Sequence, residues 1–222
     1  MTLKTIYGRP KVGKTTFALA GAPKGKTAIL SSDQGLIGID TTGFTVVEDT
    51  STKNLNKTFL STPFLAKHDR IVIDTATSLY NDFLLEIGGG GAVSLNQRGI
   101  CNNSFAALLR TLRNSKKDVY VVVQEKLQRP DEEWQSDDDD EDVNSMTVPD
   151  LSPGPYSILM QMSDAIGRLY IAQVNDKPVR RLWLGPSSSI VAGARSKIYK
   201  GNPPYLKQPT PARLNQLLGW TR

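Results

Sequence analysis

The sequence predicts an α/β fold: a mostly parallel sheet flanked by helices, with a β-rich C-terminal extension. Residues 70–74 and 119–123 are nearly continuous runs of apolar, β-branched residues, the pattern of strands buried on both faces of a parallel sheet. Between the start of the chain and Gln124, such strands alternate with helical segments, and this alternation is typical of parallel α/β proteins. We expect residues 1–222 to form a single domain without internal repeats.

The elements of the N-terminal half are predicted from apolar patterns and from the positions of glycine and proline. A strand over residues 2–7 runs into Gly8, and a compact apolar helix over residues 14–20 stops before a glycine and a proline. Short apolar runs predict the other strands, and helical spacing or composition predicts the other helices. We place these strands at residues 26–31, 44–47, 70–74 and 119–123, and these helices at residues 54–66, 78–87 and 105–113. Pro63 is expected to break the helix over 54–66 near its end.

The sequence changes in character after Gln124. Residues 126–155 are polar, acidic and without periodicity, so we predict a long flexible acidic loop there. Alternating apolar residues and turn residues then predict short strands, and the last apolar positions predict a terminal helix. These strands are expected at residues 163–172, 180–184 and 190–194, and the helix at residues 212–218.

Composition restricts the class of protein. The 39% apolar and 22% charged residues are ordinary for a globular protein, and no apolar run approaches the roughly 18 residues of a membrane-spanning helix. The first residues lack the features of a secretion signal. Cys101 and His68 are the only cysteine and histidine, which excludes an internal disulfide and a Cys/His metal cluster. We therefore expect a cytoplasmic protein that makes no membrane contact.

Charge is unevenly distributed along the chain. Nine of the 22 acidic residues lie in residues 131–142, so 13 acids accompany the 27 basic residues elsewhere. From Arg168 to the end, ten basic residues accompany one acid, Asp176. Such a basic body indicates a polyanionic partner, most commonly nucleic acid, although a solvated basic surface has the same composition. The acidic run is open to three interpretations: a solvated loop tip, a DNA mimic covering the basic body, or a docking segment for a basic partner.

One motif in the sequence is specific. Residues 8–15 match G-x-x-x-x-G-K-[ST], the P-loop, and they lie between a predicted strand and a predicted helix, as this motif requires. Its glycines let successive backbone N–H groups point at a phosphate, and the N-terminus of the helix adds further donors. Lys14 is expected to reach the β- and γ-phosphates, and Thr15 to place its hydroxyl on Mg²⁺. The predicted phosphate-binding residues are Gly8, Arg9, Pro10, Lys11, Val12, Gly13, Lys14, Thr15 and Thr16.

Three further side chains are candidates because each lies at the end of a predicted strand or just after it. Asp74 ends the strand over 70–74, where a carboxylate that helps hold the metal is needed, although it is alternatively a helix N-cap. Asp33 follows the second strand and is either a water-activating group or an ordinary turn residue. Gln124 ends the strand over 119–123, where its amide would bind the γ-phosphate or water, or only end the strand.

Together these segments resemble the RecA core, and most closely the phage-encoded RecA-like ATPases that act as single-strand annealing recombinases. The resemblance is strongest over residues 4–36, 68–78 and 105–126. It implies an ATPase that uses ATP and Mg²⁺, binds single-stranded DNA, forms a ring or filament and works beside a single-strand-binding protein. It also implies Asp33 as general base and Gln124 as nucleotide sensor. Arg195, with Lys197 and Lys200, falls where such subunits reach a neighbour's γ-phosphate; phosphate-backbone contact or solvation are the alternatives.

Two departures from that family and two rival functions accompany the resemblance. The chain starts at its first strand, without the N-terminal segment that joins RecA-type subunits, and the segment after Gln124 is acidic where a DNA-binding loop is basic. One rival is a small-molecule phosphotransferase, although Arg129 is the only arginine between Gln124 and the acidic run that a lid could use. The other rival is a nucleotide-dependent DNA-binding scaffold that does not hydrolyse ATP.

Overall fold

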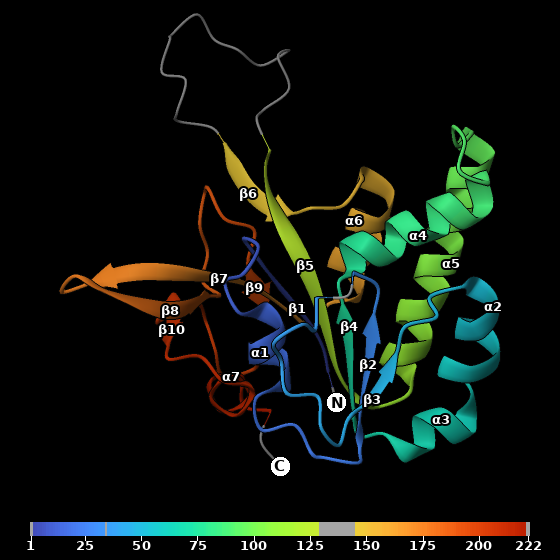
Figure 1. The fold of residues 1–222 in the computed structure, drawn as a ribbon. Coiled ribbons are helices and arrows are strands. Elements are labelled where there is room, and N and C mark those ends of the chain that lie inside the picture. Colours follow the sequence, from blue (N-terminus) through green and yellow to red (C-terminus); the bar gives the residue numbers. More distant parts are fainter. Residues whose placement is uncertain (1, 34, 129–144, 221–222) are drawn as a thin grey trace, which may run out of the picture.

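A mixed sheet with a parallel centre forms the middle of the molecule (Figure 1). The structure, a computed structural model, describes residues 2–33, 35–128 and 145–220. The parallel strands lie in the order β7 (Ala165–Val174), β1 (Leu3–Gly8), β5 (Asp118–Gln128), β4 (Arg70–Asp74), β2 (Thr27–Ser31) and β3 (Thr45–Val47). Antiparallel strands extend the β7 side and the long strand β5: they are β8 (Lys177–Trp183), β10 (Tyr205–Lys207), β9 (Gly193–Ala194) and β6 (Met146–Pro149).

Helices cover both faces of this sheet (Figure 1). One face is covered by α1 (Lys14–Leu19) and α7 (Pro211–Leu218). The other is covered by α4 (Ala76–Gly88), α5 (Leu95–Asn114) and α6 (Pro153–Met162), with α2 (Thr52–Asn54), the π-helical η1 (Leu55–Phe59) and α3 (Thr62–Lys67) beside them. In the part of the chain that the structure describes, no helix combines the length and the apolar character needed to cross a membrane.

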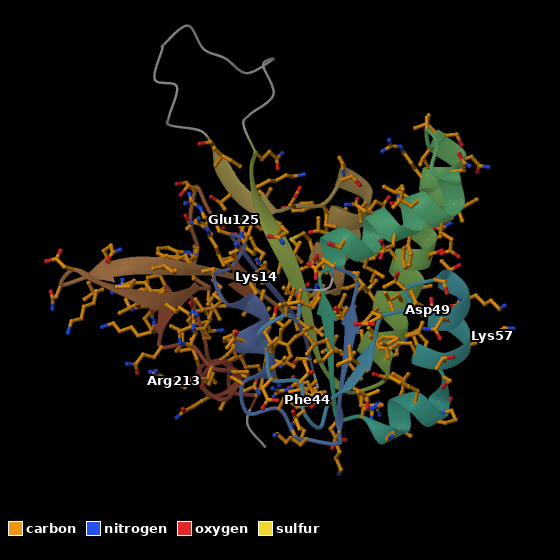
Figure 2. All side chains as sticks on the ribbon, in the orientation of Figure 1. Lys14, Phe44, Asp49, Lys57, Glu125 and Arg213 are labelled. Carbon is orange, nitrogen blue, oxygen red and sulfur yellow. The ribbon has the colours of Figure 1, made fainter. Side chains whose placement is uncertain are left out.

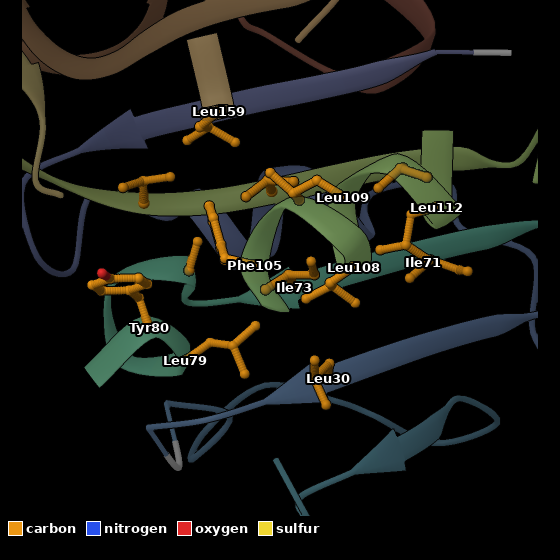
Figure 3. Packing of buried hydrophobic residues seen from close by; sticks show 14 of the residues in the cluster. Leu30, Ile71, Ile73, Leu79, Tyr80, Phe105, Leu108, Leu109, Leu112 and Leu159 are labelled. Atoms are coloured by element: carbon orange, nitrogen blue, oxygen red, sulfur yellow. The ribbon is translucent and has the colours of Figure 1, made fainter. Parts of the chain in front are cut away.

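The central strands are buried on both sides, as their apolar runs predict. Ile71 and Ile73 pack against the α4 and α5 face, whereas Val72 between them packs against the α1 face. Figure 3 shows the first of these two clusters, where Phe105 and Leu109 of α5 lie over the strands. Burial of each such side chain stabilises the fold by roughly 1.5–3 kcal/mol relative to exposure. The core therefore fixes the strand ends that carry the polar candidates.

The predicted helix over residues 54–66 is wrong in its boundaries. The segment consists of α2, η1 and α3, and the helical structure stops at Leu60 and Ser61, before the proline. Pro63 lies in the first turn of α3, where its missing N–H costs no intrahelical bond, and Ser61 accepts a hydrogen bond from Phe64 N at 3.3 Å. The proline therefore begins a helix here instead of ending one.

Two other predictions in the middle of the chain need correction. Helix α5 begins at Leu95, well before residue 105, because Ser94 and Gln97 form a capping box ahead of a polar first half that lacks apolar spacing. The predicted loop over residues 126–155 includes the end of β5, all of β6 and the start of α6. The acidic run over 131–142 lies outside the described residues.

Candidate nucleotide-binding site

The P-loop joins β1 to α1 at the carboxyl edge of the parallel strands. Its first glycine, Gly8, ends β1 so close to β7 that a Cβ would lie 2.3 Å from the backbone oxygen of Leu169. Its second, Gly13, is the N-cap of α1 with φ 95° and ψ 32°, in the left-handed region that favours glycine. The sequence motif and the backbone conformation therefore agree at both glycines.

Lys14 lies at the centre of this loop. Its Nζ donates hydrogen bonds to the backbone oxygens of Gly8 and Arg9, both at 2.8 Å, and to Gln124 Oε1 at 3.4 Å. The residue is 6% exposed, and burial lowers the pKa of its ammonium, while the negative charges of Asp74, Glu125 and Asp33 oppose that shift. The ammonium is thus held where a phosphate bound by the loop would need a positive charge.

Thr15 and Asp74 meet beside Lys14. Thr15 Oγ1 donates to Asp74 Oδ2 at 2.8 Å, and Asp74 is 2% exposed. Burial raises the pKa of Asp74 to about 6; the Thr15 bond and the charge of Lys14 oppose this shift, whereas the charge of Asp33 adds to it. The residues that the sequence assigns to a metal are therefore adjacent.

The oxygens of Thr15 and Asp74 are the hard ligands that Mg²⁺ prefers. No cluster of three or more His, Cys, Asp or Glu suited to a metal occurs among the described residues. Mg²⁺ usually completes its coordination with substrate phosphates and water, so a pair of protein oxygens next to a P-loop fits this ion.

Gln124 lies between the P-loop and Asp74, because β5 is inserted between β1 and β4. The strand that carries Asp74 is therefore the second from the P-loop strand and not its direct neighbour. Gln124 is in register with Gly8, its backbone N–H donates to Thr77 Oγ1 at 3.3 Å, and its carbonyl accepts from Asp150 N at 2.7 Å. Thr77 and Asp150 therefore fix the backbone of Gln124, while its side-chain amide oxygen contacts Lys14.

Asp33 follows β2 at the same edge of the sheet. The residue is exposed, and its Oδ1 accepts a hydrogen bond from the backbone N–H of Gly35 at 2.9 Å. Ser32, the residue before it, donates its backbone N–H to the carbonyl of Asp74 at 2.9 Å, so Asp33 lies close to the end of β4. The structure thus places Asp33 beside the site in a turn, the alternative that the sequence left open.

Arg195 lies at the other end of the strands. Its Nη2 donates to Gln161 O at 2.8 Å, and its backbone N–H donates to the carbonyl of Asp164. Asp164 in turn binds the backbone N–H and the carbonyl of Leu3, the first residue of β1. The P-loop follows the opposite end of this strand. Arg195 is therefore distant from the P-loop of its own chain, and Lys197 and Lys200, further along, are exposed.

Glu125 and Arg168 form an ion pair at this site, and the sequence analysis identified neither residue as part of it. Arg168 Nε donates to Glu125 Oε2 at 2.8 Å and its Nη2 donates to Oε1 at 3.1 Å, while Arg9 of the P-loop donates to the same carboxylate at 3.2 Å. The Glu125 side chain is 9% exposed, and Figure 2 shows it with Lys14 near the upper end of the central strands. The one signal in the sequence that could have suggested Glu125 as a site residue is its position directly after Gln124.

Arg180 of β8 is the second residue that sequence reasoning missed. Its Nε donates to the backbone oxygen of Val12 at 3.0 Å, and it lines a pocket of about 90 Å³ with Gly13 and Thr16. Since 168 positions separate Arg180 from Val12, no local signal in the sequence connects them. A larger cavity, about 300 Å³, lies between η1 and α5 on the opposite face and contains no P-loop residue.

Comparison with known proteins agrees with this geometry. A family model described as an AAA domain matches residues 3–196. The crystal structure of a KaiC-like protein from the hyperthermophilic archaeon Pyrococcus horikoshii OT3 matches with a TM-score of 0.50 at 11% identity, covering 82% of this chain and 77% of the other. No curated protein matches the sequence. The similarity to the solved structure concerns the fold, and the predicted RecA-like P-loop fold is confirmed.

Proposed function

Because the chain belongs to the AAA domain family of P-loop ATPases, we propose that it hydrolyses ATP with Mg²⁺, binds single-stranded DNA and promotes annealing or strand exchange. The observation that carries the nucleotide part is the convergence of Lys14, Thr15, Asp74 and Gln124 at one edge of the sheet. The DNA part is supported by the basic C-terminal third and by the resemblance to phage annealing recombinases. In that role the protein would act in phage homologous recombination, in the host cytoplasm, beside a single-strand-binding protein.

Each residue of the site has a distinct role in this proposal. The P-loop backbone and Lys14 bind the β- and γ-phosphates and compensate their charge. Mg²⁺, held by Thr15 and Asp74, would neutralise further phosphate charge. Gln124 hydrogen-bonds the γ-phosphate or the attacking water. Gln124 directly precedes the segment of β5 that pairs with β6, and its carbonyl accepts a hydrogen bond from Asp150 N, just after β6, so a change in its contacts would reach the β5–β6 pair.

Hydrolysis requires a group that orients water, and Asp33 is the candidate of this chain. One oxygen of its carboxylate accepts the backbone N–H of Gly35, a hydrogen bond that would break when Asp33 orients water beside a γ-phosphate. Arg195 would act on a neighbouring copy, and its exposure and its distance from its own P-loop support this role. Hydrolysis would then depend on assembly into a ring or filament, as with arginines supplied in trans elsewhere.

DNA binding would use the basic surface of the C-terminal third. Asp176 is the only acidic residue after Arg168, and most of the basic residues there are exposed. These exposed basic residues are Lys177, Arg180, Arg195, Lys197, Lys200, Lys207 and Arg213. Contacts with backbone phosphates would make the affinity fall steeply with salt.

One observation favours a second function, a scaffold that binds ATP and DNA but turns over negligibly. The Asp33 carboxylate is hydrogen-bonded to the backbone of Gly35. The side chain of β5 that contacts Lys14 is the Gln124 amide, and an amide does not abstract a proton. Such a protein would use ATP binding alone to switch its affinity for DNA.

ATP turnover with and without single-stranded DNA tests these functions, using the whole protein beside Lys14→Ala. Stimulation by DNA that is lost in Lys14→Ala supports the annealing ATPase. ATP binding without turnover supports the scaffold. Turnover that ignores DNA indicates a phosphotransferase and contradicts both.

A further inference from the structure

We propose that Arg180 and the pocket beside it bind the nucleoside of ATP, with the base stacked on the guanidinium plane. This inference rests on the proposed nucleotide site and specifies its second half, because the residues assigned so far contact only phosphates and metal. It assigns a ligand-binding role to the β7–β8 hairpin, which lies outside the P-loop motif.

Sheet order determines the direction in which a bound nucleotide runs. Gln124 and Asp74, the groups expected at the γ-phosphate, belong to β5 and β4, on one side of β1. Lys14 points toward that side, because its Nζ bonds Gln124 Oε1. The phosphate chain therefore has its terminal end over β5 and β4, and the nucleoside must leave on the other side of β1, toward β7 and β8.

A pocket lies in that direction. It is bounded by Thr16 and Ala20 of the α1 segment, Leu169 of β7, Arg180 of β8 and Pro209. Thr16 follows the metal-site residue Thr15, so the pocket is continuous with the P-loop. Its volume of about 90 Å³ is below the roughly 300 Å³ at which pockets enclose whole ligands, so it would hold part of a nucleoside and leave the rest exposed.

Arg180 is held against the P-loop backbone. Its Nε hydrogen bond to Val12 O fixes the edge of the guanidinium, and a Cβ at Gly13 would lie 2.9 Å from its Cζ. The residue remains exposed overall, so the group is anchored at one edge and accessible elsewhere. An anchored, planar, weakly hydrated cation is suited to stacking on an aromatic base, which a lysine ammonium cannot do.

The neighbouring arginine has a different environment. Arg181 is partly buried and its Cζ lies 4.4 Å from the centre of the Tyr205 ring. Successive residues of a strand point to opposite faces, so Arg181 lies away from the pocket. Lys57, exposed on η1 and absent from the pocket lining, provides a control with the same loss of charge.

The test compares binding of ATP and of inorganic tripolyphosphate, each with Mg²⁺, by titration calorimetry on the whole protein. We expect Arg180→Ala and Arg180→Lys to weaken ATP binding at least tenfold and tripolyphosphate binding less than twofold. Lys57→Ala should change neither affinity by more than twofold, and Lys14→Ala should weaken binding of both ligands. Thermal unfolding of each variant verifies that it is folded.

Three results would overturn the inference. Unchanged ATP affinity in Arg180→Ala removes the stacking role, and equal losses for ATP and tripolyphosphate assign Arg180 to the phosphates. Full affinity in Arg180→Lys shows that only charge matters. Failure of the proposed function has a separate signature: the unmodified protein then binds neither ligand, or Lys14→Ala leaves both affinities unchanged.

Discussion

Thr15 Oγ1 donates a 2.8 Å hydrogen bond to Asp74 Oδ2, although 59 positions and a whole strand, β5, separate the two residues. The contact joins the first turn of α1 to the end of β4 across the top of β5. It places a buried carboxyl next to a hydroxyl, and burial raises the pKa of that carboxyl to about 6. The site is therefore arranged for binding at a cost in stability.

Asp74→Asn should stabilise the ligand-free protein at pH 8. The folded-state pKa of Asp74 lies above its ordinary value of 3.8, so its favourable contribution is complete below that value and is lost as the pH rises through about 6. The amide cannot ionise, and a shift of this size corresponds to about 2–3 kcal/mol. Urea unfolding of both proteins at pH 4 and pH 8 measures the difference, which we expect only at pH 8. A gain of equal size at both values, or a loss at pH 8, contradicts the assignment.

Gly8→Ala should destabilise the protein by about 3 kcal/mol, as overpacking at a rigid site does. The added Cβ would lie 2.3 Å from the Leu169 backbone oxygen, so β1 and β7 would have to separate. Gly99→Ala is the matched control, because its Cβ would meet nothing within 4 Å inside α5. It should stabilise by up to about 1 kcal/mol through helix propensity. Equal effects of the two substitutions on the free energy of unfolding would contradict the close contact.

Arg168→Met should cost about 3 kcal/mol, because among the described residues it leaves the buried Glu125 carboxylate with only the exposed Arg9 as an ion-pair partner. Adding Glu125→Gln removes the stranded charge, so the double variant should recover more than half of that loss. A double-mutant cycle of unfolding free energies measures the coupling. If the losses of unfolding free energy of the two single variants add up exactly to that of the double variant, the interaction between Arg168 and Glu125 does not stabilise the fold.

Single-stranded DNA binding should depend on the basic C-terminal third. For each phosphate contact removed, the slope of log affinity against log salt should fall by roughly 0.7. Fluorescence anisotropy with a labelled oligonucleotide is expected to show this for Lys177→Ala. Lys57, on η1 far from the β7–β8 hairpin (Figure 2), provides the control Lys57→Ala with an unchanged slope. Identical slopes in both variants would exclude the hairpin from the DNA-binding surface.

The local parts of the site were predictable from the sequence, and the long-range parts were not. The P-loop is contiguous, and apolar runs identify Asp74 and Gln124 as residues at strand ends. Strand order is a tertiary property, so the insertion of β5 beside β1 left no trace in local pattern.

The pairing of Arg168 with Glu125 and the contact of Arg180 with Val12 follow from that same order. Helix α5 was recognised only where its apolar positions begin, because its first half carries a cap and polar residues. The sequence therefore predicts which strand ends carry polar groups, but not which groups from other strands join them.

The most direct test of the central claim is the equilibrium affinity for ATP with Mg²⁺, measured for the unmodified protein and for Lys14→Ala. Lys14 Nζ is the group that Gly8, Arg9 and Gln124 hold at the centre of the loop. If this loop binds the phosphates, Lys14→Ala should weaken ATP binding by about 100-fold, since losing a charge-assisted contact costs about 1.5–3 kcal/mol. Equal affinity in the two folded proteins would contradict a nucleotide site at this edge of the sheet.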